Sequence, residues 1–245
     1  MQSRCSIKHT NSIIAYLDRY LTMPISNPIE LFSLIESIEK GKRHFTMGVR
    51  DLLKFYEAFS LMEDEKIMKF RKVVKIPQTN VDNYIPEDAK LILAFNRLDN
   101  ENYRIVFRLL TYSGIRLIEA IYLLNNYDAK KMIRTNEIAK YPLNLVRKTK
   151  KVYYAYIPNE FTKGLRRIKL SEDSAKKNII KSGIPSKYIR KWNYNFLISN
   201  GVPEGTIDFL QGRVSSSVGS LHYLSKVHQA DLFYAKITSK LLNIL

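Results

Sequence analysis

The sequence has one cysteine, few glycines and prolines, and no long apolar run. Cys5 is alone among 245 residues, which excludes a disulfide framework and a cysteine zinc cluster. Nine glycines and eight prolines exclude a collagen-like or linker-like chain. No apolar run approaches the roughly 18 residues of a membrane span. The first residues, MQSRCSIKHT, have no apolar signal core. We therefore expect a cytoplasmic protein.

Negative charge is also scarce. The chain has 40 Lys and Arg against 23 Asp and Glu, a formal net charge of +17. This excess predicts a polyanionic partner. Nucleic acid is the favoured candidate, and an anionic membrane surface is the weaker one. The basic residues are spread along the chain rather than along one amphipathic face, which disfavours the membrane. Because 45% of residues are hydrophobic, a folded core can form.

The first third of the chain is predicted to be a helical domain, residues 1–75. Apolar residues recur at helical spacing over about 13–21, 28–38, 45–62 and 65–73. Asn27 is expected to cap the second helix, with Pro28 in its first turn. Val49, Leu53 and Phe59 are expected to face inward in the third. The polar stretch at 76–83, around Pro77, predicts a linker.

The second domain, 84–245, is predicted to be mainly α with a small antiparallel β-sheet. Helices are expected at 86–98 and 101–113, after Gly114, and at 185–200, 203–210 and 229–245. The β-like runs 143–147 and 152–158 predict a hairpin around the polar turn 148–151.

Familiar catalytic motifs are missing from the sequence. There is no phosphate-cradling glycine loop, no HExxH and no GxSxG. The four histidines are scattered and have no acidic companions at ligand spacing. We expect neither a metal site nor a cofactor.

Three cationic segments stand out instead. Arg116, in SGIRLIE, starts a helix where free backbone N–H groups favour a phosphate, and Glu119 can pair with it. Arg190, in KYIRKW, flanks a buried apolar stripe. Arg213 follows Gly212 and precedes a small-residue run and Tyr223. Each segment alone is more simply explained by ordinary surface or packing.

Taken in order, these segments resemble the tyrosine recombinase (phage-type integrase) family. SGIRLIE resembles the helix start of the family's box I, and Lys187-x-x-Arg190 resembles the HxxR start of box II. Gly212-Arg213 resembles the GH dipeptide that follows one helix later, with the nucleophilic tyrosine shortly after it. The resemblance covers about Tyr84 to the end, and looks most like integrases of archaeal viruses and plasmids.

The resemblance implies a role for each of these residues. Tyr223 would be the nucleophile, and Arg116 and Arg190 would hold the phosphate. Glu119 would support Arg116, and Lys187 and Arg213 would add hydrogen-bond donors. A lysine of the hairpin would be the general acid; Lys150 is favoured, with Lys148 next. Lys187 and Arg213 replace the family's two histidines, so the general base is left open, and Tyr234 stays a second candidate nucleophile.

The resemblance also implies the partners. The chain would act on double-stranded DNA at attachment sites as a homotetramer on two duplexes, be a monomer without DNA, and use no cofactor. The alternatives are a type IB topoisomerase and a non-catalytic DNA-binding relative. The terminal helix would pack on its own domain or dock on a neighbour. Two basic clusters of the first domain are predicted to bind DNA: Lys40, Lys42, Arg43, Lys69, Arg71 and Lys72.

Overall fold

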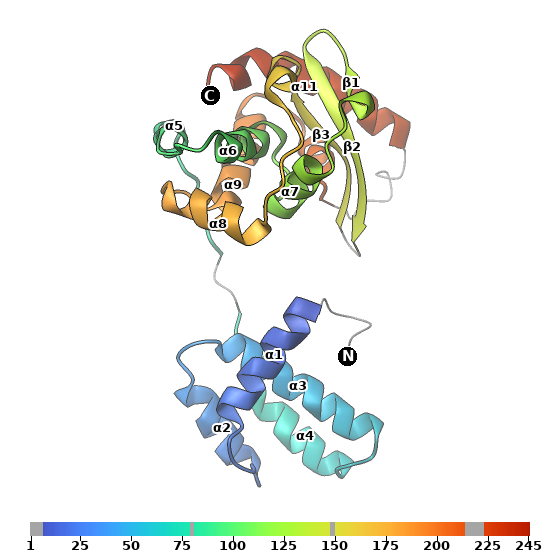
Figure 1. The fold of residues 1–245 in the computed structure, drawn as a ribbon. Coiled ribbons are helices and arrows are strands. Elements are labelled where there is room, and N and C mark those ends of the chain that lie inside the picture. Colours follow the sequence, from blue (N-terminus) through green and yellow to red (C-terminus); the bar gives the residue numbers. More distant parts are fainter. Residues whose placement is uncertain (1–6, 79–80, 148–149, 214–222) are drawn as a thin grey trace. The chain divides into compact units, whose positions relative to one another are not determined.

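The computed structural model describes residues 7–78, 81–147, 150–213 and 223–245, without the side chains of residues 8, 147, 150 and 223–225. The side chains proposed for Tyr223, Lys148 and Lys150 therefore lie outside the described part. The chain divides into two units, Met1–Asp82 and Asn83–Leu245 (Figure 1).

The amino-terminal unit consists of helices around a small core of its own. They are α1 (Ile7–Tyr20), α2 (Pro28–Ser37), α3 (Lys42–Ala58) and α4 (Asp64–Val73). Asn27 caps α2 as predicted, because its side chain accepts hydrogen bonds from two backbone N–H groups of the first turn. Phe45, Val49 and Leu53 are buried. The prediction for Phe59 was wrong: it follows the end of α3 and is 63% exposed.

The carboxy-terminal unit combines helices with one antiparallel sheet, as the sequence predicted. Its α-helices are α5 (Asp88–Asn96), α6 (Glu101–Ser113), α7 (Leu117–Asn125), α8 (Glu172–Lys181), α9 (Ser186–Ser199), α10 (Glu204–Leu210) and α11 (Tyr223–Leu242). Two 3-10 helices, Ala129–Lys131 and Glu160–Gly164, join them. The sequence analysis missed α8 and placed the start of α11 six residues too late.

The sheet is larger than the predicted hairpin. Its order is β1 (Ile133–Arg134), β2 (Ile138–Arg147) and β3 (Lys150–Pro158), all antiparallel. Arg147 pairs with Lys150, so the strands extend into the predicted turn. The consecutive residues Ala155, Tyr156 and Ile157 are all buried, so β3 is covered on both faces.

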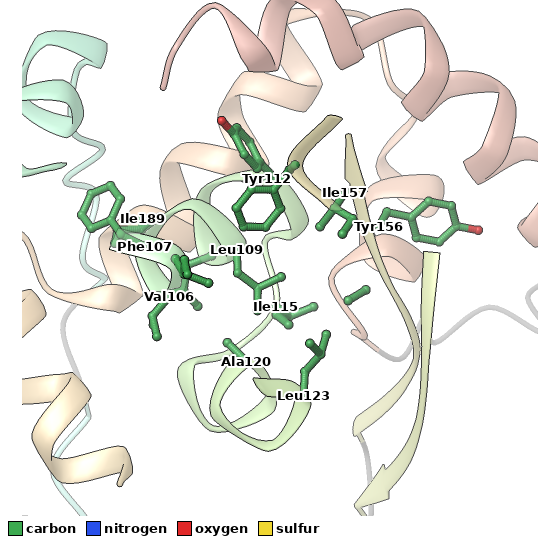
Figure 2. Packing of buried hydrophobic residues seen from close by; sticks show 14 of the residues in the cluster. Val106, Phe107, Leu109, Tyr112, Ile115, Ala120, Leu123, Tyr156, Ile157 and Ile189 are labelled. Atoms are coloured by element: carbon green, nitrogen blue, oxygen red, sulfur yellow. The ribbon is translucent and has the colours of Figure 1, made fainter. Parts of the chain in front are cut away.

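Helix α6 lies at the centre of this unit and packs on α9 and β3 (Figure 2). Val106, Phe107 and Leu109 of α6 are fully buried. Gly114 ends the helix in the left-handed conformation, with φ 61°. A Cβ at Gly114 would lie 2.1 Å from Asn193 Oδ1, so glycine lets α9 approach the start of α7.

Helix α11 packs on its own unit. Ala230, Tyr234, Ile237 and Leu241 are buried in the core of this unit. The Tyr234 hydroxyl donates to the backbone oxygen of Tyr112 at 3.0 Å. Nowhere in the described residues is there a helix both long and apolar enough to cross a membrane.

Candidate active site

Arg116 stands at the start of α7, where Glu119 holds it. The backbone N–H of Arg116 donates to Glu119 Oε2 at 2.7 Å, and its Nη1 donates to Glu119 Oε1 at 2.8 Å. Glu119 is 3% exposed and binds both the backbone and the guanidinium of Arg116. The supporting role of Glu119 stays a prediction.

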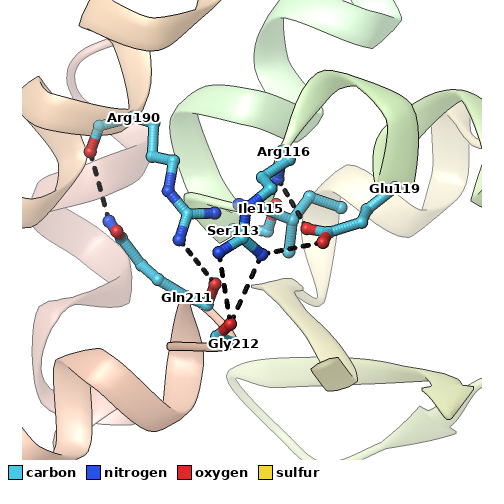
Figure 3. Close-up of polar contacts among 7 residues, drawn as sticks. All are labelled: Ser113, Ile115, Arg116, Glu119, Arg190, Gln211 and Gly212. Carbon is cyan, nitrogen blue, oxygen red and sulfur yellow. Dashed lines mark hydrogen bonds and ion pairs between the residues drawn. The ribbon is translucent and has the colours of Figure 1, made fainter. Parts of the chain in front are cut away.

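Arg190 approaches Arg116 from α9 (Figure 3). Its Nη2 donates to the backbone oxygen of Gln211 at 2.8 Å, and both Nη atoms of Arg116 donate to the next carbonyl, Gly212, at 3.3 and 3.4 Å. Two consecutive carbonyls therefore hold the two guanidinium groups side by side. The sequence placed both arginines in the site but did not identify these acceptors.

The end of α10 explains why the two carbonyls face the arginines. The N–H groups of Gly212 and Arg213 donate back to the carbonyls of Phe209 and Asp208 at 3.1 and 2.7 Å. Gly212 adopts φ 62° in this helix-ending turn, a conformation that favours glycine. The turn directs the carbonyls at 211 and 212 away from the helix.

A buried amide pair anchors this turn to α9. Gln211 Nε2 donates to the Arg190 carbonyl at 3.2 Å and to Asn193 Oδ1 at 2.8 Å. Asn193 in turn donates to the carbonyls of Thr111 and Tyr112 at the end of α6. Both amides are fully buried. Sequence analysis missed them, since their partners come from helices distant in the chain.

The charges of the site favour an anion. Burial and the neighbouring Arg116 lower the pKa of Arg190 to about 9, and Arg213 adds to this shift. Arg190 Nη1 is buried without a hydrogen-bond partner in the described part of the chain. Clustered cations and an unused N–H group are costly without a ligand, and a phosphate oxygen would satisfy both.

Arg213 lies at the edge of this cluster. Its Nε is 3.9 Å from Asp208 Oδ1, and its guanidinium lies 4.4 Å from the centre of the Tyr194 ring. Burial raises the pKa of Asp208, and the positive charges of Arg213, Lys226 and Arg190 act against this shift. The Tyr194 hydroxyl donates to Glu204, and burial together with this bond raises the pKa of Tyr194 to about 12.

The β2–β3 hairpin, which carries the lysines predicted as general acid, packs close to the arginine cluster. A Cβ at Gly212 would lie 2.1 Å from Val152 Cγ2 and 3.1 Å from the Lys151 carbonyl, so the start of β3 packs against the turn that holds the arginines. Lys150 is the first residue of β3. The backbone therefore brings its position close to the arginines, while its side chain lies outside the described part.

Lys187 lies in α9, about one helical turn before Arg190. It is exposed, and its ammonium lies 4.4 Å from the centre of the Tyr188 ring. The charged groups that shift the pKa of Arg190 are Arg116, Glu119, Arg213 and Asp208. The structure thus joins Arg116, Arg190 and Arg213 with Glu119.

Of the two candidate nucleophiles, only Tyr234 has a side chain within the described part of the structure. Tyr223 is the first residue of α11, and Lys226 in the same turn interacts electrostatically with Asp208 of α10. Tyr234 is 1% exposed, its hydroxyl is bonded, and burial raises its pKa well above the usual value. Tyr234 is therefore unavailable as a nucleophile in the folded chain.

Most of the basic side chains predicted to bind DNA in the amino-terminal unit are paired. Lys42 contacts Glu36 at 3.0 Å, Lys69 contacts Glu65 at 2.7 Å, and Arg71 is bonded to Glu57 through both carboxylate oxygens. Arg43 donates to the Pro77 carbonyl at 2.6 Å. A cavity of about 770 Å³ beside Arg71 is lined by further basic residues: Arg50, Lys54 and Lys75.

Solved structures share this fold. A lambda integrase dimer bound to a COC′ core site matches with a TM-score of 0.64 and 11% identity, over 85% of this chain and 87% of that one. The XerH recombinase bound to its difH substrate matches with a TM-score of 0.56 and 10% identity, over 90% and 78%. A search of the curated proteins gives no match. The fold is thus that of tyrosine recombinases.

The family is assigned from a match between the sequence and a family model. The model of the archaeal phage integrase family matches residues 83–240, nearly all of the carboxy-terminal unit and well over half of the chain. The chain belongs to this family and is a site-specific DNA recombinase.

Proposed function

We propose that this integrase cleaves and rejoins double-stranded DNA through a covalent bond between Tyr223 and a backbone phosphate. The observation that supports this most is the arginine pair. Arg116 and Arg190 are held on consecutive carbonyls, and one buried N–H group of Arg190 is left without a partner among the described residues. Such a pair suits the two non-bridging oxygens of a phosphodiester.

The proposed reaction has two steps, cleavage of one strand and rejoining to another. The Tyr223 oxygen bonds to phosphorus and gives its proton to solvent water, while the bond from phosphorus to the 5′ oxygen breaks. The hairpin lysine, Lys150 or next to it Lys148, gives that oxygen a proton. The resulting 3′-phosphotyrosyl bond keeps the energy of the phosphodiester, so the 5′ hydroxyl of a second strand can reverse the step.

The arginines would stabilise the charge that develops on the phosphate. Arginine does not deprotonate at physiological pH, and its planar fork binds two oxygens. Arg213 at the edge of the pair would supply a further donor.

The partner would be DNA at an attachment site. The matched lambda integrase and XerH structures are bound to a COC′ core site and to difH, and the present chain carries a net charge of +17. Exchange between two duplexes requires four active sites, so we infer a homotetramer on DNA. Phosphate contacts would supply most of the affinity, which should fall steeply with salt.

The test is a nicked duplex that carries a candidate attachment site and traps the covalent product. Wild type in EDTA should give a protein–DNA band on a denaturing gel, and Tyr223→Phe should give none. Tyr194→Phe is the matched control, because Tyr194 lies beside Arg213 and should keep the band. A band with Tyr223→Phe would disprove the assignment of the nucleophile.

A second assay separates recombination from topoisomerase activity. A recombinase should resolve a four-way junction of two attachment sites at a rate similar to its cleavage rate. Efficient relaxation of supercoiled DNA without junction resolution would favour the type IB topoisomerase alternative. Salt-sensitive DNA binding with neither activity on a proven site would favour a non-catalytic relative.

A further inference from the structure

Gln211 contacts Arg190 at both of its ends (Figure 3). The Gln211 backbone carbonyl accepts from Arg190 Nη2 at 2.8 Å, and the Gln211 side-chain Nε2 donates to the Arg190 backbone carbonyl at 3.2 Å. One residue therefore binds both the guanidinium and the main chain of Arg190. A movement of Arg190 relative to Gln211 would lengthen or break at least one of these two bonds.

Donors and acceptors fix the orientation of the Gln211 amide. Asn193 uses its Nδ2 for two carbonyls at the end of α6, so its Oδ1 accepts from Gln211 Nε2 at 2.8 Å. Nε2 thus donates one proton to Asn193 and the other to Arg190. A reversed Gln211 amide would place an oxygen against these two acceptors, so only one orientation fits.

Burial indicates that this amide serves its hydrogen bonds rather than packing. Gln211 is fully buried, and its Oε1 has no partner among the described residues. A buried acceptor without a donor costs free energy, and an apolar side chain of the same length would avoid that cost. Packing by itself would therefore favour an apolar residue at this position. What the amide adds is its pair of bonds to Arg190 and Asn193.

The arginine pair needs a restraint before DNA binds. After burial, the positive charge of Arg116 is the largest cause that lowers the pKa of Arg190, so the two guanidinium groups oppose each other's charge. Glu119 holds Arg116 through a carboxylate, whereas the Gln211 contact of Arg190 is to a neutral carbonyl. A neutral acceptor attracts a guanidinium less strongly than a carboxylate does. The position of Arg190 therefore depends on how firmly this carbonyl is held.

We propose that Gln211 is a positioning residue whose side chain holds Arg190 beside Arg116 before the DNA phosphate arrives. Because Gln211 is fully buried, it acts through the main chain of Arg190 and through its own backbone carbonyl rather than on the DNA. This inference rests on the proposed role of Arg190 as a phosphate ligand. It does not depend on where the nucleophile lies.

The first test removes the amide and keeps the length of the side chain. Gln211→Met should slow covalent-complex formation on the nicked duplex roughly 30-fold at saturating protein, within the loss of about 10²-fold that a small misplacement can cause. DNA affinity should change little. Gln211→Glu should lose more, because a carboxylate cannot donate to the Arg190 carbonyl or to Asn193. An unchanged rate in Gln211→Met would overturn the proposal.

A double-mutant cycle distinguishes positioning of Arg190 from a general loss of structure. Gln211→Met should slow the wild-type enzyme but add little to the loss caused by Arg190→Ala, because the side chain that it positions is already gone. Losses that multiply in the double variant would show that Gln211 acts independently of Arg190 and would overturn the assignment.

A modified substrate gives a second readout of the same role. A methylphosphonate at the cleaved position replaces one charged non-bridging oxygen by a methyl group, so less negative charge has to be stabilised. The ratio of wild-type to Gln211→Met rates should therefore be smaller on this substrate than on the natural phosphodiester. An equal ratio on both substrates would mean that the amide does not act through the phosphate ligands, which contradicts the proposal.

Ile207→Val is the matched control for stability. It shortens a fully buried side chain of α10, the helix that ends at Gln211, and should lower Tm without a comparable loss of rate. Equal losses of rate at equal losses of Tm in Ile207→Val and Gln211→Met would show that Gln211 only stabilises the fold. An unchanged cleavage rate in Arg190→Ala would instead disprove the proposed function, whatever the result for Gln211.

Discussion

The two units of this integrase hold their basic side chains in opposite ways. In the amino-terminal unit, Lys42, Lys69 and Arg71 lie near the surface and pair with glutamates. In the carboxy-terminal unit, Arg116 and Arg190 lie together, and backbone carbonyls hold them. Arg116 has one acid, Glu119, which fixes its position.

This difference between the units shows that a cluster of basic side chains does not by itself identify the reactive site. Exposed ion pairs contribute little free energy and exchange freely with salt, so clusters of lysine do not by themselves mark a reactive site. Adjacent half-buried arginines repel each other, and a fold keeps such an arrangement when a ligand satisfies it. On this view, changes in the arginine pair should affect the reaction, and changes in the amino-terminal clusters should affect only affinity.

The largest effect is expected from Arg190→Ala. The covalent-complex rate on the nicked duplex should fall by about 10³-fold, since one donor to the developing charge is lost in a buried site. DNA affinity should change much less. Arg71→Ala in the amino-terminal unit is the matched control and should keep the cleavage rate at saturating protein. Comparable losses in both variants would contradict the distinction between the units.

Gly212→Ala should have the next largest effect. An added Cβ would lie 2.1 Å from Val152 Cγ2, and φ there is 62°. The turn would shift and move the carbonyl that holds Arg116, so we expect about a 10²-fold loss of cleavage. Gly201→Ala is the control: it has φ 77° but nothing within 4 Å of the new Cβ. It should cost about 1 kcal/mol of stability and leave cleavage intact.

Asn193→Ala should have a smaller effect on the reaction. It removes the amide that links Gln211 to the end of α6 and takes one donor from each of the buried Thr111 and Tyr112 carbonyls, at a cost of about 1–3 kcal/mol in stability. Since the backbone contacts of both arginines stay, cleavage should fall by only about tenfold, the change expected for about 1.4 kcal/mol of transition-state stabilisation. Thermal unfolding and cleavage are measured together, with Asn200→Ala, at the far end of α9, as the control.

The sequence predicted those parts of the fold that local residue patterns determine. The Asn27 cap and the break at Gly114 were read correctly because each depends on a few neighbouring residues. Helix α8 was missed because its sequence, EDSAKKNIIK, is mostly polar and buries only Ala175 and Ile179. Strand β1 was missed because both of its residues are exposed.

In the site, too, the sequence predicted only the residues that occur in a local pattern. A comparison of motifs placed Arg116 and Arg190 together, since each occurs in a recognisable local pattern. Asn193 and Gln211 could not be found that way. Their roles depend on partners 18 or more residues away in the chain, and no local spacing distinguishes such a buried amide from a surface one. Only the tertiary structure supplies those partners.

The smallest expected effect concerns the amino-terminal unit. Arg50 and Lys54 line the basic cavity, whereas Lys69 is paired with Glu65 at an exposed position. If the cavity binds a DNA backbone phosphate, Arg50→Gln should reduce the slope of log affinity against log salt by about 1. Lys69→Gln should reduce it less, because its charge is already compensated. Fluorescence anisotropy over a salt series measures both slopes, and equal changes would mean that the ion pairs of this unit open when DNA binds.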